Sequence, residues 1–272
     1  MNIDLHTHTN VSDGKLTPSA LLQRAAEKGI ELLSITDHDT TAAYLSLPKP
    51  PTSLTVIPGI EFSTYWRKIG IHIVGLNIDL ESSALHEAIN FQGHARQQRA
   101  EHIAEKLEKQ GIKDALKGAR DVAGDNHNIG RPHFAEYLLQ IGAVKSINQA
   151  FDRYLDAKSG DIKTYWAALP RIIEWIRAAG GIAVLAHPLH YKLTRTKLIE
   201  LLEDFIDAGG EGLEVVSGKQ SLSAISALGK ICTQKQLLAS CGSDFHQPDL
   251  RWAELGQFPS LPKTCKPVWD LF

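Results

Sequence analysis

The sequence is poor in cysteine and lacks any long apolar run. Its three cysteines, Cys232, Cys241 and Cys265, form no C-x-x-C pair, which argues against a disulfide framework and a cysteine zinc site. No stretch approaches the roughly 18 consecutive apolar residues of a membrane-spanning helix. The first residues, MNIDLHTHTN, also lack the basic and then apolar pattern of a signal peptide. We therefore expect a cytoplasmic protein with no membrane partner.

The chain also lacks an excess of charge of either sign. Lys and Arg number 29 and Asp and Glu number 31, so the formal net charge is −2. No global field therefore recruits nucleic acid or anionic lipid, and any recognition of phosphate must be local. With 43% hydrophobic and 22% charged residues, the composition is that of an ordinary globular protein.

Short apolar runs alternate with amphipathic segments at both ends of the chain. We expect strands at residues 3–5, 32–35, 55–57, 71–76, 181–186, 212–216 and 237–240. We expect helices between them at residues 17–28, 172–179, 196–208 and 222–234, and a purely helical stretch with helices at 86–110, 131–142 and 146–154. The pattern predicts a barrel-like α/β domain made of residues 1–80 and 171–272, interrupted by a helical insertion at 81–170.

Imidazoles and carboxylates recur just past the expected strands, where barrels place their ligands. In H-x-H on an extended segment, both rings point to the same side. One histidine at such a position is more often a structural residue, but the whole set favours a metal site, because burying these carboxylates without a cation would cost several kcal/mol each. Nitrogen and oxygen donors without thiolate suit Mn²⁺, Zn²⁺ or Fe²⁺. The candidate ligands, too many for one ion, are His6, His8, Asp13, His38, Glu61, His72, His187, Asp244 and His246.

The order of these motifs resembles a known family. DLHTHTNVSDG, SITDHDT, PGIEFS, HIVGL, AHP and GSDFH are similar to the motifs of the polymerase and histidinol phosphatase (PHP) family, and the resemblance covers almost the whole chain. IGRPHFAEYL, ARQQR and FDRYL resemble the subgroup that hydrolyses 3′,5′-nucleoside bisphosphates, whose members also act as 5′-to-3′ exoribonucleases on short RNA. The resemblance implies an α/β fold, a distorted (β/α)7 TIM-like barrel with a helical insertion.

The resemblance also implies a site for three divalent metal ions, usually Mn²⁺. By position, His6, His8, Glu61 and Asp244 match the ligands of one ion, Asp13, His38 and His246 those of the second, and Glu61, His72 and His187 those of the third. Two neighbouring ions can activate water and stabilise the charge of an in-line displacement at phosphorus. We expect Asp13 or His187 to help move protons as catalytic groups.

Basic residues of the insertion are the candidate substrate ligands. Arg96 and Arg99 lie three residues apart and so share a helix face, which is able to hold a phosphate or is merely solvated. Arg131 and His133 open a helix, where backbone donors favour anions, although His133 could equally cap the helix.

Two departures from the subgroup pattern concern substrate binding. Where the subgroup has a GK-x-G-Y stretch, this chain reads DAKSGDIKTYW, so Lys158 and Lys163 are both candidates for the phosphate-binding lysine. His190 stands where the subgroup tends to have an arginine, and a neutral imidazole there would bind phosphate more weakly.

These observations predict a metal-dependent phosphoesterase that removes the 3′-phosphate from a 3′,5′-bisphosphorylated nucleoside and trims short 5′-phosphorylated RNA from its 5′ end. A phosphatase for a small metabolite such as histidinol phosphate is the alternative enzyme, against which the arginine pair and the GRPH segment weigh. A non-catalytic nucleic-acid-binding module is the other alternative. We expect no obligate protein partner and no attached polymerase domain, since the chain starts at its first ligand strand.

Overall fold

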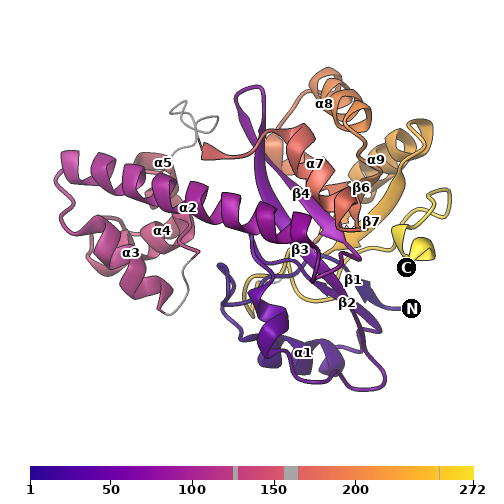
Figure 1. Ribbon diagram of the computed structural model, residues 1–272, viewed down its shortest axis with the longest axis horizontal. Coiled ribbons are helices and arrows are strands. Elements are labelled where there is room, and N and C mark those ends of the chain that lie inside the picture. Colours follow the sequence, from indigo (N-terminus) through magenta and orange to yellow (C-terminus); the bar gives the residue numbers. More distant parts are fainter. Residues whose placement is uncertain (125–127, 156–164, 251) are drawn as a thin grey trace.

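The computed structural model describes residues 1–124, 128–155, 165–250 and 252–272. These residues form one sheet in which the strands follow each other in chain order (Figure 1). The strands are β1 (Ile3–Asp4), β2 (Leu32–Ile35), β3 (Thr55–Trp66), β4 (Ile69–Leu76), β5 (Ile182–Leu185), β6 (Gly212–Ser217) and β7 (Leu238–Gly242). The N–H of Leu5 donates to the carbonyl of Cys241 at 3.1 Å, which joins the first strand to the last. The sheet is thus a nearly closed barrel, as the sequence predicted.

The hairpin of β3 and β4 distorts this barrel. β1, β2 and β3 pair in parallel, as do β5, β6 and β7, whereas β4 is antiparallel to both of its neighbours. Only Arg67 and Lys68 separate β3 from β4, and a parallel connection needs a dozen residues or more. The expected end of β3 at residue 57 was wrong: Pro58 ends the pairing with β2, but the strand continues because Gly59 and the residues after it pair with β4.

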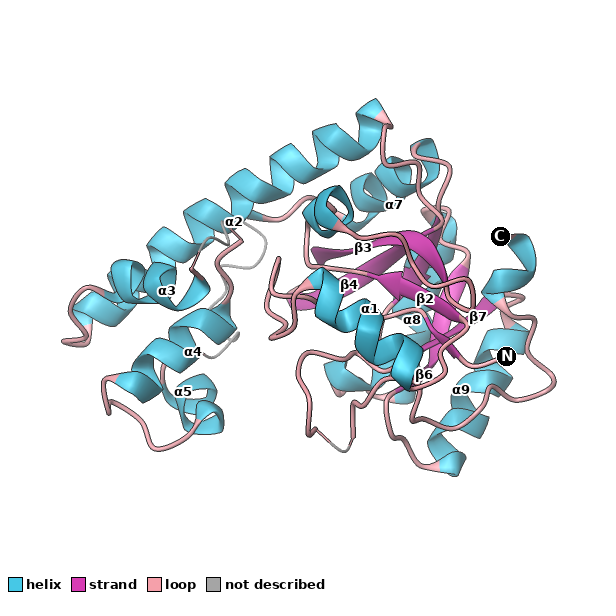
Figure 2. Ribbon diagram, turned by 90° about the horizontal axis from the view of Figure 1, so that it is seen from below, coloured by secondary structure: helices cyan, strands magenta, loops and turns pink. Residues whose placement is uncertain are grey.

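Helices cover the outside of the barrel (Figure 2). They are α1 (Pro18–Glu27), α7 (Leu169–Ala178), α8 (Arg195–Asp207) and α9 (Leu222–Gln234). The side chains of Thr17, Thr194 and Ser221 accept backbone N–H groups at the starts of α1, α8 and α9, so N-caps fix where these helices begin. Short 3₁₀ segments lie at Ala42–Ser46, Pro188–Tyr191 and Val268–Leu271.

The insertion leaves the barrel after β4 and returns through α7 (Figure 1). It contains α2 (Ser83–Lys109), α3 (Ala115–Ala123), α4 (Arg131–Gln140) and α5 (Ile147–Arg153). Leu85 and Ala88 of α2 are buried in the barrel core, whereas Ala104 and Leu107 are buried in a separate core formed with α3, α4 and α5. One helix therefore belongs to both cores. Within the described residues, no helix is both long and apolar enough to cross a membrane.

Candidate active site

The carboxyl edge of the sheet collects the predicted ligands. His6 and His8 follow β1 and His38 follows β2. Glu61 lies within β3, three residues beyond the last pair with β2, so it reaches the same edge. His72 lies in the first half of β4, and because β4 runs antiparallel, that half is at the edge where the parallel strands end.

The remaining ligands come from the last strands. His187 follows β5, and Asp244 and His246 follow β7. The N–H of Asp244 donates to the carbonyl of His6 and the N–H of His8 donates to that of Phe245, both at 2.9 Å. The two strand exits are therefore held side by side.

Glu61 is the centre of the cluster and is completely buried. Its carboxylate oxygens contact the imidazole nitrogens of five histidines. Oε1 lies 2.9 Å from both His72 Nδ1 and His187 Nε2 and 3.3 Å from His6 Nε2, and Oε2 lies 3.0 Å from His38 Nδ1 and 3.3 Å from His8 Nε2. Burial alone would raise the pKa of Glu61, but these rings, His6 foremost, hold it well below its ordinary value. The group is therefore an anion in the barrel interior.

Two further carboxylates complete the cluster. Asp13 Oδ1 lies 3.3 Å from His246 Nε2, and Asp244 Oδ1 lies 3.3 Å from His8 Nε2 and 3.5 Å from His6 Nε2. All nine predicted ligands therefore come together in the structure. Their ligand roles remain predictions.

The donor set fits divalent metal ions. Six buried nitrogen and oxygen atoms of the cluster have no hydrogen-bond partner: His6 Nε2, both ring nitrogens of His8, His38 Nδ1, Glu61 Oε2 and His187 Nδ1. Buried polar atoms are normally satisfied, so these need a partner of another kind. The ligand atoms form four groups in which all atoms lie within 4.8 Å of one another: His8, Asp13, His38 and His246; His6, His8 and Glu61; His38, Glu61 and His72; and His187, His190 and Asp244.

Glu214 on β6 was missed by the sequence analysis. Its two carboxylate oxygens lie 3.2 and 3.1 Å from His6 Nδ1, and Oε2 accepts the backbone N–H of His187 at 2.6 Å. This contact turns His6 Nε2 towards Glu61 and Asp244, and it holds His187 at its positive φ of 27°. Partners of this kind fix the tautomer and direction of metal-binding imidazoles. The sequence did contain a signal for this residue, because a glutamate inside the apolar run GLEVV is unusual for a buried strand.

Two aspartates near His38 have structural partners. The carboxylate of Asp37 accepts the N–H and hydroxyl of Thr9 and the hydroxyl of Ser12, so it shapes the loop after β1. Asp39 is buried at a φ of 54° and accepts Arg96 Nε at 2.7 Å. This ion pair ties α2 to the barrel.

A cavity of about 480 Å³ borders the cluster at His72 and His190. We call it the arginine cavity. It is lined by Ser63, Thr64, Lys68, Ile69, Gly70, His72, Arg99, Arg131, Trp166, His190 and Tyr191. Burial, with repulsion from Arg131 and Arg96, lowers the pKa of Arg99 to about 9. Among the described residues, no carboxylate lines this cavity, so the charged side chains of its lining are all cations.

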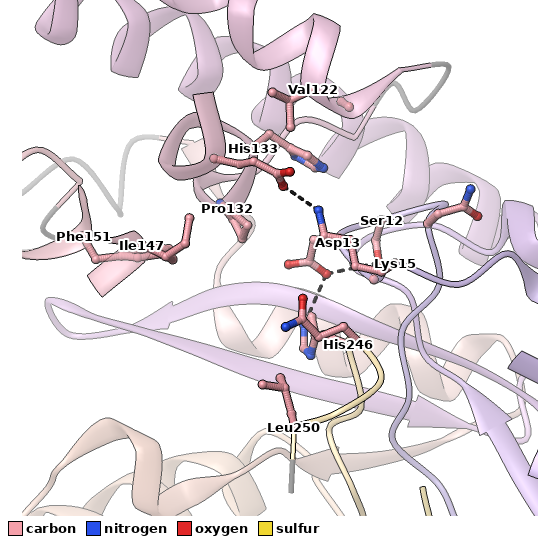
Figure 3. Close-up of a pocket in the computed structure, with 15 residues that line it drawn as sticks. Ser12, Asp13, Lys15, Val122, Pro132, His133, Ile147, Phe151, His246 and Leu250 are labelled. Carbon is pink, nitrogen blue, oxygen red and sulfur yellow. Dashed lines mark hydrogen bonds and ion pairs between the residues drawn. The ribbon is translucent and has the colours of Figure 1, made fainter. Parts of the chain in front are cut away.

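A second cavity, of about 540 Å³, borders the cluster at Asp13 and His246 (Figure 3). We call it the Phe151 cavity. It is lined by Asn10, Ser12, Asp13, Gly14, Lys15, Val122, Ala123, Pro132, His133, Glu136, Ile147, Phe151, His246, Gln247 and Leu250. It lies between the loop after β1 and the insertion, and Lys15 Nζ bridges the two by an ion pair with Glu136 at 2.5 Å.

The predicted substrate ligands are divided between these places. Arg99, Arg131 and His190 line the arginine cavity. His133 lines the Phe151 cavity and also caps α4, because its Nδ1 accepts the N–H of Gly130. Arg96 lines a third cavity within the insertion. Lys158 and Lys163 lie outside the described residues. Lys68 and Trp166 are residues of the arginine cavity that sequence reasoning did not find.

A cluster of histidines and carboxylates able to bind metal ions, at the edge of a distorted seven-stranded barrel, defines the class of this protein. The sequence of residues 4–182 matches the family model of the PHP domain. The chain belongs to the PHP family.

Two relatives and one solved structure match the chain over almost its full length. The 5′-3′ exoribonuclease Rnm of Escherichia coli is 42% identical, over 99% of this chain and 93% of that protein. The 3′,5′-nucleoside bisphosphate phosphatase of Chromobacterium violaceum is 38% identical, over 98% of this chain and 95% of that one. An amidohydrolase from Chromobacterium violaceum, solved with bound sulfate and no metal, superimposes with a TM-score of 0.87 at 38% identity, over 100% of this chain and 95% of that chain.

Proposed function

We propose that this protein is a divalent-metal-dependent phosphoesterase that removes the 3′-phosphate from 3′,5′-nucleoside bisphosphates and degrades short 5′-phosphorylated RNA from its 5′ end. The observation that carries the proposal is the meeting of nine metal-type donors, several of them buried and unpartnered, with a cavity lined by arginines. The two relatives described above bear the names of these two activities. A cytoplasmic location and an independence of protein partners belong to the same proposal.

The donor set would hold up to three ions, with Mn²⁺ as the favoured metal and Zn²⁺ or Fe²⁺ as alternatives. His6, His8, Glu61 and Asp244 would hold one, Asp13, His38 and His246 a second, and Glu61, His72 and His187 a third. Bound ions would supply Lewis-acid stabilisation of phosphate oxygens and make a water more acidic. Glu214 would orient His6, and Asp13 or His187 would move protons between solvent and the departing oxygen.

The arginine cavity would bind the phosphate that is not hydrolysed. Burial, and after it the neighbouring charge of Arg131, lowers the pKa of Arg99, so a dianionic 5′-phosphate would stabilise its charged form. The guanidinium carbon of Arg99 lies 5.3 Å from the centroid of the Trp166 ring, which fixes its direction. Lys68 adds a third cation from the hairpin turn. Lys158 and Lys163 remain candidates for a further phosphate contact.

The proposal is tested with three substrates. Mn²⁺-loaded protein is incubated with adenosine 3′,5′-bisphosphate, histidinol phosphate and a short 5′-phosphorylated RNA, and the release of phosphate and mononucleotide is followed. We expect turnover of the first and third, and its loss when a chelator removes the metal. A preference for histidinol phosphate would contradict the nucleotide assignment, and turnover of none would favour a binding module.

A variant of the arginine cavity tests the role of the 5′-phosphate. Arg99→Ala should raise KM for adenosine 3′,5′-bisphosphate by roughly 10- to 100-fold, because a hydrogen bond to a charged group contributes about 1.5–3 kcal/mol. Arg171→Ala is the matched control, since Arg171 pairs with Glu87 and Glu174 on the surface. Equal KM values for both variants would remove Arg99 from the substrate site.

A further inference from the structure

We infer that the Phe151 cavity binds the nucleotide that follows the scissile phosphate in an RNA substrate, so that it determines RNA cleavage and not bisphosphate hydrolysis. The inference rests on the proposed function and extends it to a second subsite. It begins from the positions of the two cavities, which share no lining residue among those that the structure describes.

The two cavities border the cluster at different residues. The arginine cavity reaches His72, which contacts Glu61 at 2.9 Å. On the other side of Glu61, His8 lies 3.3 Å from it, and the ring of His8 stacks on that of His246 with centroids 4.2 Å apart. His246 lines the Phe151 cavity. A phosphorus centre held at the cluster would therefore have two separate cavities beside it.

The reaction requires two such cavities. Water adds its oxygen to phosphorus, and the bond from phosphorus to the 3′-oxygen of the first nucleotide breaks. That oxygen takes up a proton, which leaves a mononucleotide with a 3′-hydroxyl and an RNA that begins with a 5′-phosphate. The attacking and leaving oxygens are roughly in line, so the 5′-oxygen of the following nucleotide points in a different direction. The first nucleotide and the rest of the chain thus need separate sites.

The charges of the lining residues indicate which part of the RNA each cavity binds. The arginine cavity carries Lys68, Arg99 and Arg131 and so suits the terminal 5′-phosphate. The Phe151 cavity carries Asp13 and Glu136, and its Lys15 is already paired with Glu136. A phosphomonoester dianion is unfavourable there.

Apolar surface favours a nucleobase in the Phe151 cavity. Ile147 and Phe151 lie on α5 one turn apart, and Leu250 comes from the loop after β7 (Figure 3). The volume of about 540 Å³ is in the range of pockets that hold small organic ligands. Every base has a π-face that stacks on an aromatic ring, so a contact with the partly buried ring of Phe151 would accept any sequence.

The start of α4 separates the two cavities. Arg131 lines the arginine cavity, and its guanidinium carbon lies 5.8 Å from the centroid of the Phe151 ring. Pro132 and His133, the next two residues, line the Phe151 cavity. The first nucleotide and the following one would therefore lie on either side of this helix end. A 3′,5′-bisphosphate has no group beyond its 3′-phosphate and leaves the Phe151 cavity unused.

The test compares two substrates on the same Mn²⁺-loaded full-length protein. kcat/KM is measured for a 5′-phosphorylated adenosine dinucleotide and for adenosine 3′,5′-bisphosphate, and the ratio of the two is taken. Phe151→Ala should lower this ratio about tenfold, at the low end of the effect of removing one base–aromatic stack. Ile147→Ala should lower it in the same direction by less. Ile141→Ala is the matched control: Ile141 is 48% exposed and Ile147 is 38% exposed, but Ile141 lines neither cavity.

The outcomes are separable. If wild-type protein hydrolyses both substrates and neither Phe151→Ala nor Ile147→Ala changes the ratio, the inference is wrong. An equal loss on both substrates would also overturn it, since the cavity would then hold the first nucleotide. Ile147→Ala decides the matter if Phe151→Ala does not fold. Wild-type protein that hydrolyses neither substrate would instead refute the proposed function itself.

Discussion

The barrel and the insertion contribute to the same site by different physical means. On the barrel edge, each candidate ligand touches others of the cluster, so the position of any one side chain is set by its neighbours: the buried Glu61 alone contacts five imidazoles. On the insertion, Arg131 and Phe151 are only partly buried and Ile147 is exposed, and Phe151 packs on a small core rich in alanine.

We expect from this difference that the barrel edge determines the reaction and that the insertion determines which substrate is bound. A cluster whose members hold one another tolerates little change, because a displaced ligand leaves other buried groups unsatisfied. The cavity walls of the insertion can change side chain by side chain without disturbing that cluster. We therefore expect barrel variants to lose all activities together and insertion variants to shift the balance between substrates.

The largest effect should come from Glu61→Gln, which keeps the shape of the side chain and removes its charge. Removing one partner of a buried charge pair costs about 3–5 kcal/mol, so metal retention and turnover should fall by roughly 100- to 1,000-fold or more. Metal content after dialysis and the rate of phosphate release are the measurements. A variant that keeps both would show that Glu61 is not a ligand.

Asp39→Asn tests the buried connection between the two regions. Asparagine tolerates positive φ, so the change removes the charge facing Arg96 without straining the backbone. Unfolding in urea should show a loss of about 3–5 kcal/mol, because a buried guanidinium is left without its counter-ion. Asp114→Asn is the control, since Asp114 has a φ of 53° but is exposed on the insertion. Similar stabilities for the two variants would mean that the ion pair does not anchor α2.

Glu214→Gln should act on the barrel edge through His6. The amide still reaches His6 but no longer stabilises one tautomer by charge, and partners of this kind alter metal affinity or activity by about 10–100-fold. The measurement is the Mn²⁺ concentration that restores half of the activity to metal-free protein. Glu211→Gln, an exposed residue just before the same strand, should leave that concentration unchanged. If the two variants behave alike, Glu214 does not position the ligand.

The smallest effect is expected for Glu136→Gln, which breaks the ion pair with Lys15 across the Phe151 cavity. Both side chains are substantially exposed, at 35% and 51%, and such pairs contribute about 0.2–1 kcal/mol. Thermal unfolding at low and high salt measures it, and the small difference should shrink as salt rises. A loss as large as that of Asp39→Asn would mean that the surface contact, and not α2, joins the two regions.

Much of the barrel edge was predictable because its signal is carried by residue types that are rare at strand ends. His6, His8, His38 and His187 stand directly after apolar runs, and chain order alone brings parallel strand ends together. Glu61 and His72 were found from their chemistry, although they lie within strands. The reversal at Arg67 that places His72 correctly was not foreseen, because the length of β3 depends on pairing with β4, which is a tertiary property.

Several residues of the cavity walls, and the glutamate that contacts His6, were harder to predict. Lys68 lies in a hairpin turn, Trp166 precedes a helix, and Glu214 sits in a strand, and each looks like an ordinary residue of its element until the chain is folded. Helix α3 was missed altogether, since Gly118 in its centre weakens the local helical signal. In the structure that glycine lies against the ring of Tyr137, where a Cβ would be only 2.1 Å from the nearest ring atom.

The sharing of α2 between two cores has a mechanical consequence. Its 27 residues make a rod about 40 Å long at 1.5 Å per residue. The barrel core buries its first turns, the pair of Arg96 with Asp39 holds its midpoint, and its second half packs against the separate core of the insertion. A tilt of about 5° at Asp39 would swing the end of this half by about 2 Å over the roughly 20 Å beyond Arg96, a lever arm that converts a slight adjustment at the barrel edge into a displacement of the insertion.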